Sequence, residues 1–331
     1  MTEQIITFEN PDILPKILGD FDKNLEIIEN EFNVTLVSRG PELKISGSSE
    51  DVKAASDVVG YLKKTAKLSE NITEQNVTYA VSMVQSSRTD ELMSFDGDCI
   101  CITTKGKPVK PKTLGQKQYV DTINKNTITI GIGPAGTGKT FLAVAMAVTA
   151  LRNKRINRII LTRPAVEAGE KLGFLPGDLQ NKIDPYLRPL YDALYEMMGA
   201  ESFNKNVEKG VIEVAPLAYM RGRTLDDSFI ILDEAQNTTP EQMKMFLTRL
   251  GFNSKAIVNG DITQIDLPDG KSSGLREAVK ILQDIDDIGI VTLSDKDVVR
   301  HTLVTKIIRA YAGYEEKKKA AMNMKYKRVK K

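Results

Sequence analysis

The stretch GIGPAGTGKT, residues 131–140, constrains this chain more than any other part of its sequence. Gly133, Gly138, Lys139 and Thr140 satisfy the pattern G-x-x-x-x-G-K-[ST] without a mismatch. An apolar run, TITIGI, enters the motif, and a helical run, FLAVAMAVTAL, leaves it. In that context the glycines turn backbone N–H groups inward, and the helix N-terminus faces a phosphate. The motif therefore predicts a phosphate-binding loop between a strand and a helix.

The parts of this loop have distinct expected roles. The ammonium of Lys139 is expected to reach the β and γ phosphates of a nucleotide, and the hydroxyl of Thr140 to ligate Mg²⁺. The residues expected to bind the cofactor are Gly133, Pro134, Ala135, Gly136, Thr137, Gly138, Lys139, Thr140 and Phe141. The expected cofactors are therefore ATP and Mg²⁺.

Two later strand ends carry polar residues. In SFIILDEAQ, Asp233 is placed to hold Mg²⁺ through water, and Glu234 to polarise the water that attacks the γ-phosphate. In KAIVNGDITQIDLP, Asp261 and Gln264 are placed beside the γ-phosphate, where they could report its presence. The first pair predicts hydrolysis and not mere binding.

A glutamine upstream of the first strand could recognise the base. In LGQKQYV, the amide of a glutamine can donate and accept at once, which suits the polar edge of adenine. Spacing alone does not choose between Gln116 and Gln118.

Apolar runs predict the fold of the larger part of the chain. TITIGI, RIILT, VIEVAP, SFIILD, KAIVNGD and GIVTL alternate with helical segments, a pattern typical of a buried parallel sheet with crossover helices. Residues 11–66 instead predict two short helices, two strands and a longer helix from Asp51 to Lys67, a small α+β module. A hairpin and a Pro/Lys linker, ICITTKGKPVKPKT, place a boundary near residue 110. The expected parts are 1–70, 71–110, 111–314 and a basic tail, 315–331.

Composition restricts the location and the partners. The net charge is +2, so overall charge favours neither nucleic acid nor a membrane surface. The N-terminus lacks a basic segment followed by an apolar stretch, and the longest apolar helical run is too short to cross a bilayer. A cytoplasmic protein without a membrane segment is expected.

The motifs GIGPAGTGKT, LTRPAVEAGEKLGFLPGD, VAPLAYMRGRT, ILDEAQN and NGDITQIDLP, in this order, resemble the PhoH family of ATPases over residues 111–312. The resemblance implies a RecA-like core, similar to the first half of superfamily-one helicases. It assigns the adenine to Gln116 in preference to Gln118. It also implies that LTRPAV touches single-stranded nucleic acid, which makes Thr162 and Arg163 candidates for contact with a phosphodiester backbone.

The chain departs from those helicases in one respect. They carry a second RecA-like half that supplies an arginine across the ATP, and no such half follows the DVVRHTLV segment. The arginine must then come from a neighbouring copy, or hydrolysis stays slow. The resemblance implies a homo-oligomer, a hexameric ring, in which a neighbour supplies it. Arg300 is the first candidate and Arg223 the second.

The N-terminal module resembles a KH-like RNA-binding domain. A KH domain clamps the nucleic-acid backbone with a Gly-x-x-Gly loop between helices. The equivalent stretch here, Gly19-Asp20-Phe21-Asp22, keeps one glycine and adds two carboxylates, which would repel phosphate. RNA binding by this module and a role in protein contact or structure both remain open.

The expected function is that of a Mg²⁺-dependent ATPase coupled to the unwinding or remodelling of single-stranded RNA, with Lys139, Glu234, Gln264 and Arg300 as its catalytic residues. One alternative is a nucleotide-gated scaffold with low turnover. The other is a small-molecule kinase, which would need an acceptor site that no motif here resembles.

Overall fold

The computed structural model describes residues 1–67, 72–94, 99–164, 179–268 and 270–299, together with residues 303, 304, 307 and 310. Side chains are described over the same residues except 94 and 179–186. Contacts divide the chain into two compact units. The first comprises Met1–Phe95 with the C-terminal segment from Val299, and the second comprises Asp96–Val298.

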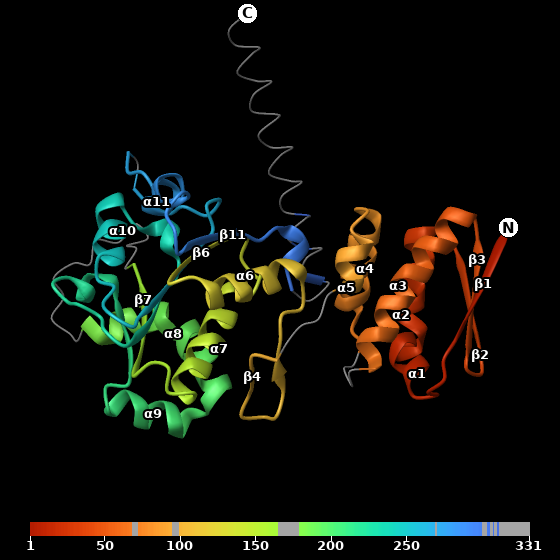
Figure 1. Cartoon of the computed structure of the whole chain (residues 1–331), viewed down its shortest axis with the longest axis horizontal. Coiled ribbons are helices and arrows are strands. Elements are labelled where there is room, and N and C mark those ends of the chain that lie inside the picture. The colour runs from red at the N-terminus through yellow and green to blue at the C-terminus, as the bar shows by residue number, and fades with distance from the viewer. Residues whose placement is uncertain are drawn as a thin grey trace, which may run out of the picture. The chain divides into compact units, whose positions relative to one another are not determined.

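The N-terminal unit begins with a three-stranded antiparallel sheet of order β1-β3-β2 (Figure 1). Its elements follow the order strand, helix, helix, strand, strand, helix: β1 (Thr2–Thr7), α1 (Ile13–Leu18), α2 (Lys23–Phe32), β2 (Thr35–Arg39), β3 (Glu42–Gly47) and α3 (Ser49–Lys67). The predicted helices and strands of residues 11–66 are thus confirmed. Strand β1 was not predicted from the sequence. Two further helices, α4 (Glu74–Gln85) and α5 (Thr89–Ser94), also belong to this unit.

A short 3₁₀ turn, η1 (Asp20–Asp22), connects α1 to α2. Gly19, Phe21 and Asp22 all have positive φ angles, of 71°, 55° and 59°. Only glycine adopts this left-handed region without steric cost. The side chain of Phe21 is 92% exposed, so the connection presents an aromatic ring to solvent.

The second unit is built on a six-stranded sheet of order β11-β6-β10-β9-β7-β8. All of its pairings are parallel. The strands are β6 (Ile128–Ile132), β7 (Arg158–Arg163), β8 (Ile212–Pro216), β9 (Ser228–Leu232), β10 (Lys255–Gly260) and β11 (Ile288–Thr292). The six apolar runs of the sequence therefore form the predicted parallel sheet.

Helices cover both faces of this sheet. They are α6 (Leu114–Lys125), α7 (Lys139–Arg152), α8 (Leu179–Met198), α9 (Ala200–Glu208), α10 (Pro240–Leu247) and α11 (Gly274–Leu282) (Figure 1). The predicted hairpin, β4 (Cys101–Ile102) with β5 (Pro108–Val109), precedes α6.

Successive residues of β9 show how the two faces are filled. Phe229 and Ile231 pack with apolar residues of α6, α7 and α8, whereas Ile230 and Leu232 pack with residues of α10 and α11. Alternate side chains of a strand point to opposite faces, so a sheet buried on both sides needs continuous apolar runs. The unit has the predicted RecA-like α/β fold. Its parallel strands bring their carboxyl ends to one edge, where Arg163 at the end of β7 lies with the segments that follow β6, β9 and β10.

Candidate nucleotide site

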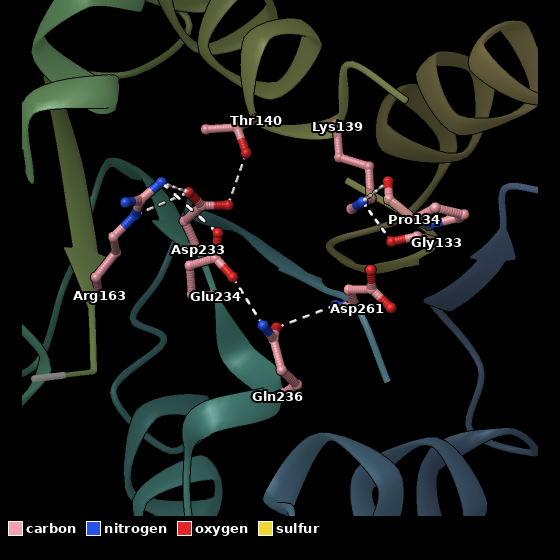
Figure 2. Close-up of polar contacts among 9 residues, drawn as sticks. All are labelled: Gly133, Pro134, Lys139, Thr140, Arg163, Asp233, Glu234, Gln236 and Asp261. Atoms are coloured by element: carbon pink, nitrogen blue, oxygen red, sulfur yellow. Dashed lines mark hydrogen bonds and ion pairs between the residues drawn. The ribbon is translucent and has the colours of Figure 1, made fainter. Parts of the chain in front are cut away.

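The phosphate-binding loop runs from the end of β6 into the start of α7. Gly136 and Gly138 have φ angles of 88° and 78°, which side chains with a Cβ rarely adopt. The ammonium of Lys139 lies back across the loop, 2.7 Å from the carbonyl oxygen of Gly133 and 3.0 Å from that of Pro134 (Figure 2). Only 9% of Lys139 is exposed. The lysine thus stabilises the loop from inside, at the position where phosphate oxygens would compete for its charge.

Thr140 and Asp233 meet across two elements. The Thr140 hydroxyl at the start of α7 donates to Oδ1 of Asp233, at 2.7 Å, directly after β9. Asp233 is 3% exposed. A hydroxyl and a carboxylate are oxygen donors of the kind that Mg²⁺ prefers, so this pair fits the predicted metal site. Among the described residues no cluster of three or more His, Cys, Asp or Glu side chains has metal-binding geometry, so a metal here would also need phosphate or water ligands.

Arg163 occupies the other oxygen of the same carboxylate. Its Nε and Nη2 donate to Oδ2 of Asp233 at 2.9 and 2.5 Å, and Nη2 lies 4.0 Å from Oε1 of Glu234. The arginine ends β7, which pairs in parallel with β9. Its side chain is 14% exposed and that of Asp233 is 4% exposed. Arg163 therefore offsets the negative charge at the end of β9.

This placement bears on the two residues expected to touch nucleic acid. The side chain of Thr162 is fully buried, and its carbonyl oxygen accepts from the backbone N–H of Asp233 at 2.9 Å. In this structure Thr162 thus presents no group to a phosphodiester backbone, and the guanidinium of Arg163 faces the carboxylates.

Glu234 combines exposure with backbone strain. Its side chain is 48% exposed, so solvent reaches the carboxylate. Its φ angle is 54°, in the left-handed region that costs free energy for a residue with a side chain. Strain of this kind persists where the surrounding structure fixes it, and it is common at functional sites.

Gln236 connects Glu234 to the loop after β10. Its Nε2 donates to Oε2 of Glu234 at 2.7 Å, and its Oε1 accepts from the backbone N–H of Asp261 at 3.0 Å (Figure 2). Gln236 is 1% exposed, within the turn η3 (Ala235–Asn237). Sequence reasoning did not single out this residue. The polar run DEAQN after an apolar strand was the available signal.

The side chains of Asp261 and Gln264 lie differently. Asp261 is 6% exposed, and its Oδ1 accepts from the backbone N–H and the hydroxyl of Thr263 at 2.9 and 2.6 Å. Its Oδ2 is buried without a hydrogen-bond partner among the described residues. Gln264 is exposed, and its backbone N–H donates to the Asp261 carbonyl at 3.1 Å. The loop is therefore tied to β10 by its backbone, while the Gln264 side chain faces solvent.

Both polar atoms of the Gln116 side-chain amide make hydrogen bonds. Its Nε2 donates to the carbonyl of Thr137, in the phosphate-binding loop, at 3.0 Å, and its Oε1 accepts from the N–H of Lys112 at 2.6 Å. Gln116 is buried, whereas Gln118 is exposed. Gln116 thus links the segment before α6 to the phosphate-binding loop.

A buried tyrosine on α6 reaches the strand that carries Asp261. The Tyr119 hydroxyl donates to Oδ1 of Asn259 at 2.6 Å, and burial raises the pKa of Tyr119. The ring lies against Gly131, where an added Cβ would come within 2.6 Å of it. Gly131 therefore allows α6 to pack closely on β6.

The two arginines expected to act in a neighbouring site differ in what the structure describes. Arg300 lies outside the described residues. Arg223 makes two hydrogen bonds to Glu213, at 2.5 and 2.7 Å, and these bonds raise its pKa. Arg223 would therefore have to leave this carboxylate to serve a neighbour.

No helix in the described part of the chain is both long and apolar enough to cross a membrane.

Comparisons with known proteins agree with the site. The family model described as PhoH-like protein matches residues 108–312. The PhoH-like protein of Bacillus subtilis is 51% identical over 315 residues, which cover 94% of this chain and 99% of that protein. The PhoH-like protein of Mycobacterium tuberculosis (strain H37Rv) is 56% identical over 309 residues, 92% of this chain and 87% of that protein. Protein PhoH of Escherichia coli K12 is 40% identical over 264 residues, 79% of this chain and 72% of that protein.

Solved structures resemble the chain only distantly. The SWI2/SNF2 ATPase core of Sulfolobus solfataricus has a TM-score of 0.33 at 15% identity, over 54% of this chain and 43% of that one. The Pif1 helicase of Candida albicans has a TM-score of 0.30 at 16% identity, over 55% and 40%. The assignment therefore depends on the family match, the curated relatives and the P-loop geometry, and on these grounds the chain belongs to the PhoH-like protein family of P-loop NTPases.

Proposed function

We propose that this protein hydrolyses ATP with Mg²⁺ and couples hydrolysis to the remodelling of single-stranded RNA. The observation that carries the hydrolytic half is the arrangement of Asp233 and Glu234 beside the phosphate-binding loop. Asp233 meets the Thr140 hydroxyl, while Glu234 is half exposed and oriented by Gln236. A carboxylate that solvent reaches, next to a phosphate grip, suits water as the acceptor.

Each residue has a role in this proposal. Lys139 exchanges its carbonyl contacts for the β and γ phosphates. Thr140 and Asp233 would hold Mg²⁺, which supplies positive charge to the transferring phosphoryl group when it is bound. Glu234 orients and polarises the attacking water. Gln264 lies in the loop after β10, and its solvent-facing side chain can turn toward a γ-phosphate. Gln116 contacts the base and links that contact to the phosphate-binding loop through its hydrogen bond to the Thr137 carbonyl.

The proposal includes an arginine from a neighbouring copy, in a ring, with Arg300 as the first candidate. Charge that develops on the γ-phosphate needs a cation beyond Lys139 and Mg²⁺, and an arginine supplied in trans raises the rate by about a thousandfold or more. Specific activity should then rise with protein concentration.

The N-terminal module is proposed to be KH-like. The order β1-α1-α2-β2-β3-α3 supports this, because Gly19–Asp22 falls in the connection between two helices, where a KH domain carries its Gly-x-x-Gly loop. With carboxylates at Asp20 and Asp22, the loop is proposed to contribute little to RNA affinity in this chain.

A scaffold with low turnover is the second candidate, and one observation favours it. Lys139, Thr140, Asp233 and Arg163 all bind one another or the loop, so the groups that would contact a nucleotide are held by partners of this chain. A protein that only switches its shape on binding ATP would need no more than this.

ATPase rates measured with and without single-stranded RNA, across protein concentrations, separate these functions. The Lys139→Ala variant gives the baseline, and Lys105→Ala, in the exposed turn of the β4–β5 hairpin, is the matched control. A coupled ATPase shows a rate that RNA and protein concentration both raise. A scaffold binds ATP but stays at the Lys139→Ala baseline, and that result would refute the proposal.

A further inference from the structure

A pocket of about 470 Å³ lies beside the loop that follows β10. Its walls come from that loop and from α11, and they include the hydroxyl residues Thr263 and Ser272 and three cations, Lys271, Arg276 and Lys280. The three cations are exposed. None of them has a role in the nucleotide site described above.

The charge of this pocket is positive. One carboxylate, Glu277, lines it together with the three cations. Outside the lining, hydrogen bonds to its own backbone and to Thr239 lower the pKa of Glu241, and the positive charge of Lys271 adds to this shift. Glu241 therefore partly offsets one of the three cations. Cations therefore outnumber carboxylates around this pocket, although the net charge of the whole protein is only +2.

The chemistry of the lining residues fits a phosphodiester backbone. Lysine, arginine and hydroxyl side chains are among the groups with which proteins contact phosphate and sugar. Ile265 adds an apolar surface to the same pocket, on which a sugar can pack. The pocket thus matches the backbone of a nucleic-acid strand and has no evident means of reading a base.

The pocket is connected to the hydrolytic carboxylate by hydrogen bonds. Nη2 of Arg276 donates to the carbonyl of Ile262 at 2.6 Å, next to Asp261. The hydroxyl of Ser273, at the start of α11, donates to the carbonyl of Gln236 at 2.7 Å. Gln236 in turn binds both Glu234 and the N–H of Asp261. A phosphate that draws Arg276 away from Ile262 would therefore shift the loop that Gln236 holds.

We propose that this pocket binds the phosphodiester backbone of single-stranded nucleic acid and that its occupancy alters hydrolysis through Arg276 and Gln236. The inference rests on the proposed function, because it names the place where the strand meets the ATPase. Lys271 and Lys280 supply affinity, and Arg276 supplies the coupling.

The test uses the full chain and two fluorescent probes of equal length, oligouridine and oligothymidine. In the variant Lys271→Ala/Lys280→Ala, strand affinity should fall about tenfold, and the salt dependence of binding should lose about 1.4 from its slope, since each phosphate contact contributes about 0.7 for a single strand. ATP hydrolysis without a strand should be unchanged. The control Lys205→Ala/Lys209→Ala removes two exposed lysines at the end of α9 and should bind as the parent does.

Arg276→Lys tests the coupling separately. It keeps the charge but loses the planar group that reaches Ile262, so affinity should stay within about twofold while strand-induced stimulation of hydrolysis falls. Stimulation equal to that of the parent would refute the coupling.

The outcomes distinguish the two proposals. If the parent neither binds nor responds to either strand, the nucleic-acid half of the proposed function fails, and this pocket fails with it. If the parent binds but the double lysine variant matches its control, only the pocket is wrong. If polyglutamate displaces the strand as well as an unlabelled strand of equal charge does, the pocket is a general anion site and the proposal is overturned.

Discussion

Arg163 holds the carboxylate of Asp233 across the ends of two paired parallel strands, with Nε and Nη2 at 2.9 and 2.5 Å from the same oxygen. The other oxygen of that carboxylate accepts from Thr140. Because Mg²⁺ would approach the same group, the guanidinium and the metal are alternative sources of positive charge for one buried acid.

Arg163→Gln should therefore destabilise the nucleotide-free protein far more than the loaded one. Removing one partner of a buried pair leaves an uncompensated charge, which costs about 3 kcal/mol. Unfolding in EDTA should show this loss, and Mg²⁺ with a non-hydrolysable ATP analogue should restore most of it. Arg158→Gln, at the other end of β7, is the control. Equal losses with and without Mg²⁺ and nucleotide would contradict the idea.

Glu234→Gln should keep nucleotide and metal bound, because Lys139, Thr140 and Asp233 remain. Hydrolysis should slow about a hundredfold or more, since a positioned base contributes at least that much. Nucleotide titration and phosphate release measure the two effects, with Glu201→Gln on α9 as the control. Loss of ATP binding together with activity would mean that Glu234 is structural.

Gln236→Met keeps the volume of a buried side chain and removes both of its hydrogen bonds. The N–H of Asp261 is then left unsatisfied, so stability should fall by about 1–3 kcal/mol. Turnover should fall as well, with little change in KM, because Glu234 loses its orienting partner. Gln242→Met also breaks a hydrogen bond, to the N–H of Thr239, but should cost stability only. If both variants turn over at the parent rate, Gln236 does not position Glu234.

Asp22→Gly should raise the affinity of the N-terminal module for RNA. Asp22 has a φ of 59°, which glycine adopts freely, so the change relieves strain of about 1 kcal/mol while it removes a carboxylate and restores the second glycine of the loop. Asp20→Gly removes the same charge at a residue without a positive φ and should lower stability. Anisotropy and thermal unfolding compare the two. Equal gains in affinity would show that charge alone, and not the loop, limits binding.

A mixture of two inactive variants tests the shared arginine. Arg300→Ala keeps its own ATP site, and Lys139→Ala keeps its arginine, so mixed rings should regain activity wherever an intact site meets an intact arginine. Each variant alone should be nearly inactive. A mixture that exchanges subunits and stays inactive would exclude Arg300 as the shared residue.

The parts predicted from sequence were those encoded locally. A strand, a glycine loop and a helix follow one another at residues 128–152, and each apolar run of the sheet carries its own signal. The parts that could not be predicted depend on pairing between distant segments. Strand β1 is mostly exposed, with little alternation to reveal it, and it forms by pairing with β3 some forty residues away.

The same reason applies to the site. The position of the Asp233 and Glu234 carboxylates could be predicted because an apolar strand runs directly into two acidic residues. That Arg163 faces them depends on the register between β7 and β9, which the sequence does not state. That Gln116 contacts the Thr137 carbonyl likewise depends on how α6 packs against the loop.

Because the six strands of the larger sheet are parallel, their amino ends lie at the edge opposite the one that carries the candidate nucleotide site. Asp261 directly follows the carboxyl end of β10, and in the turn before its amino end the side chain of Phe252 is 90% exposed. Once the exposed thiol of Cys99 is removed, a dye on a cysteine placed at Phe252 would sit a full strand length from the proposed phosphate site. Such a label could report on β10 during turnover without touching the groups that bind or hydrolyse ATP.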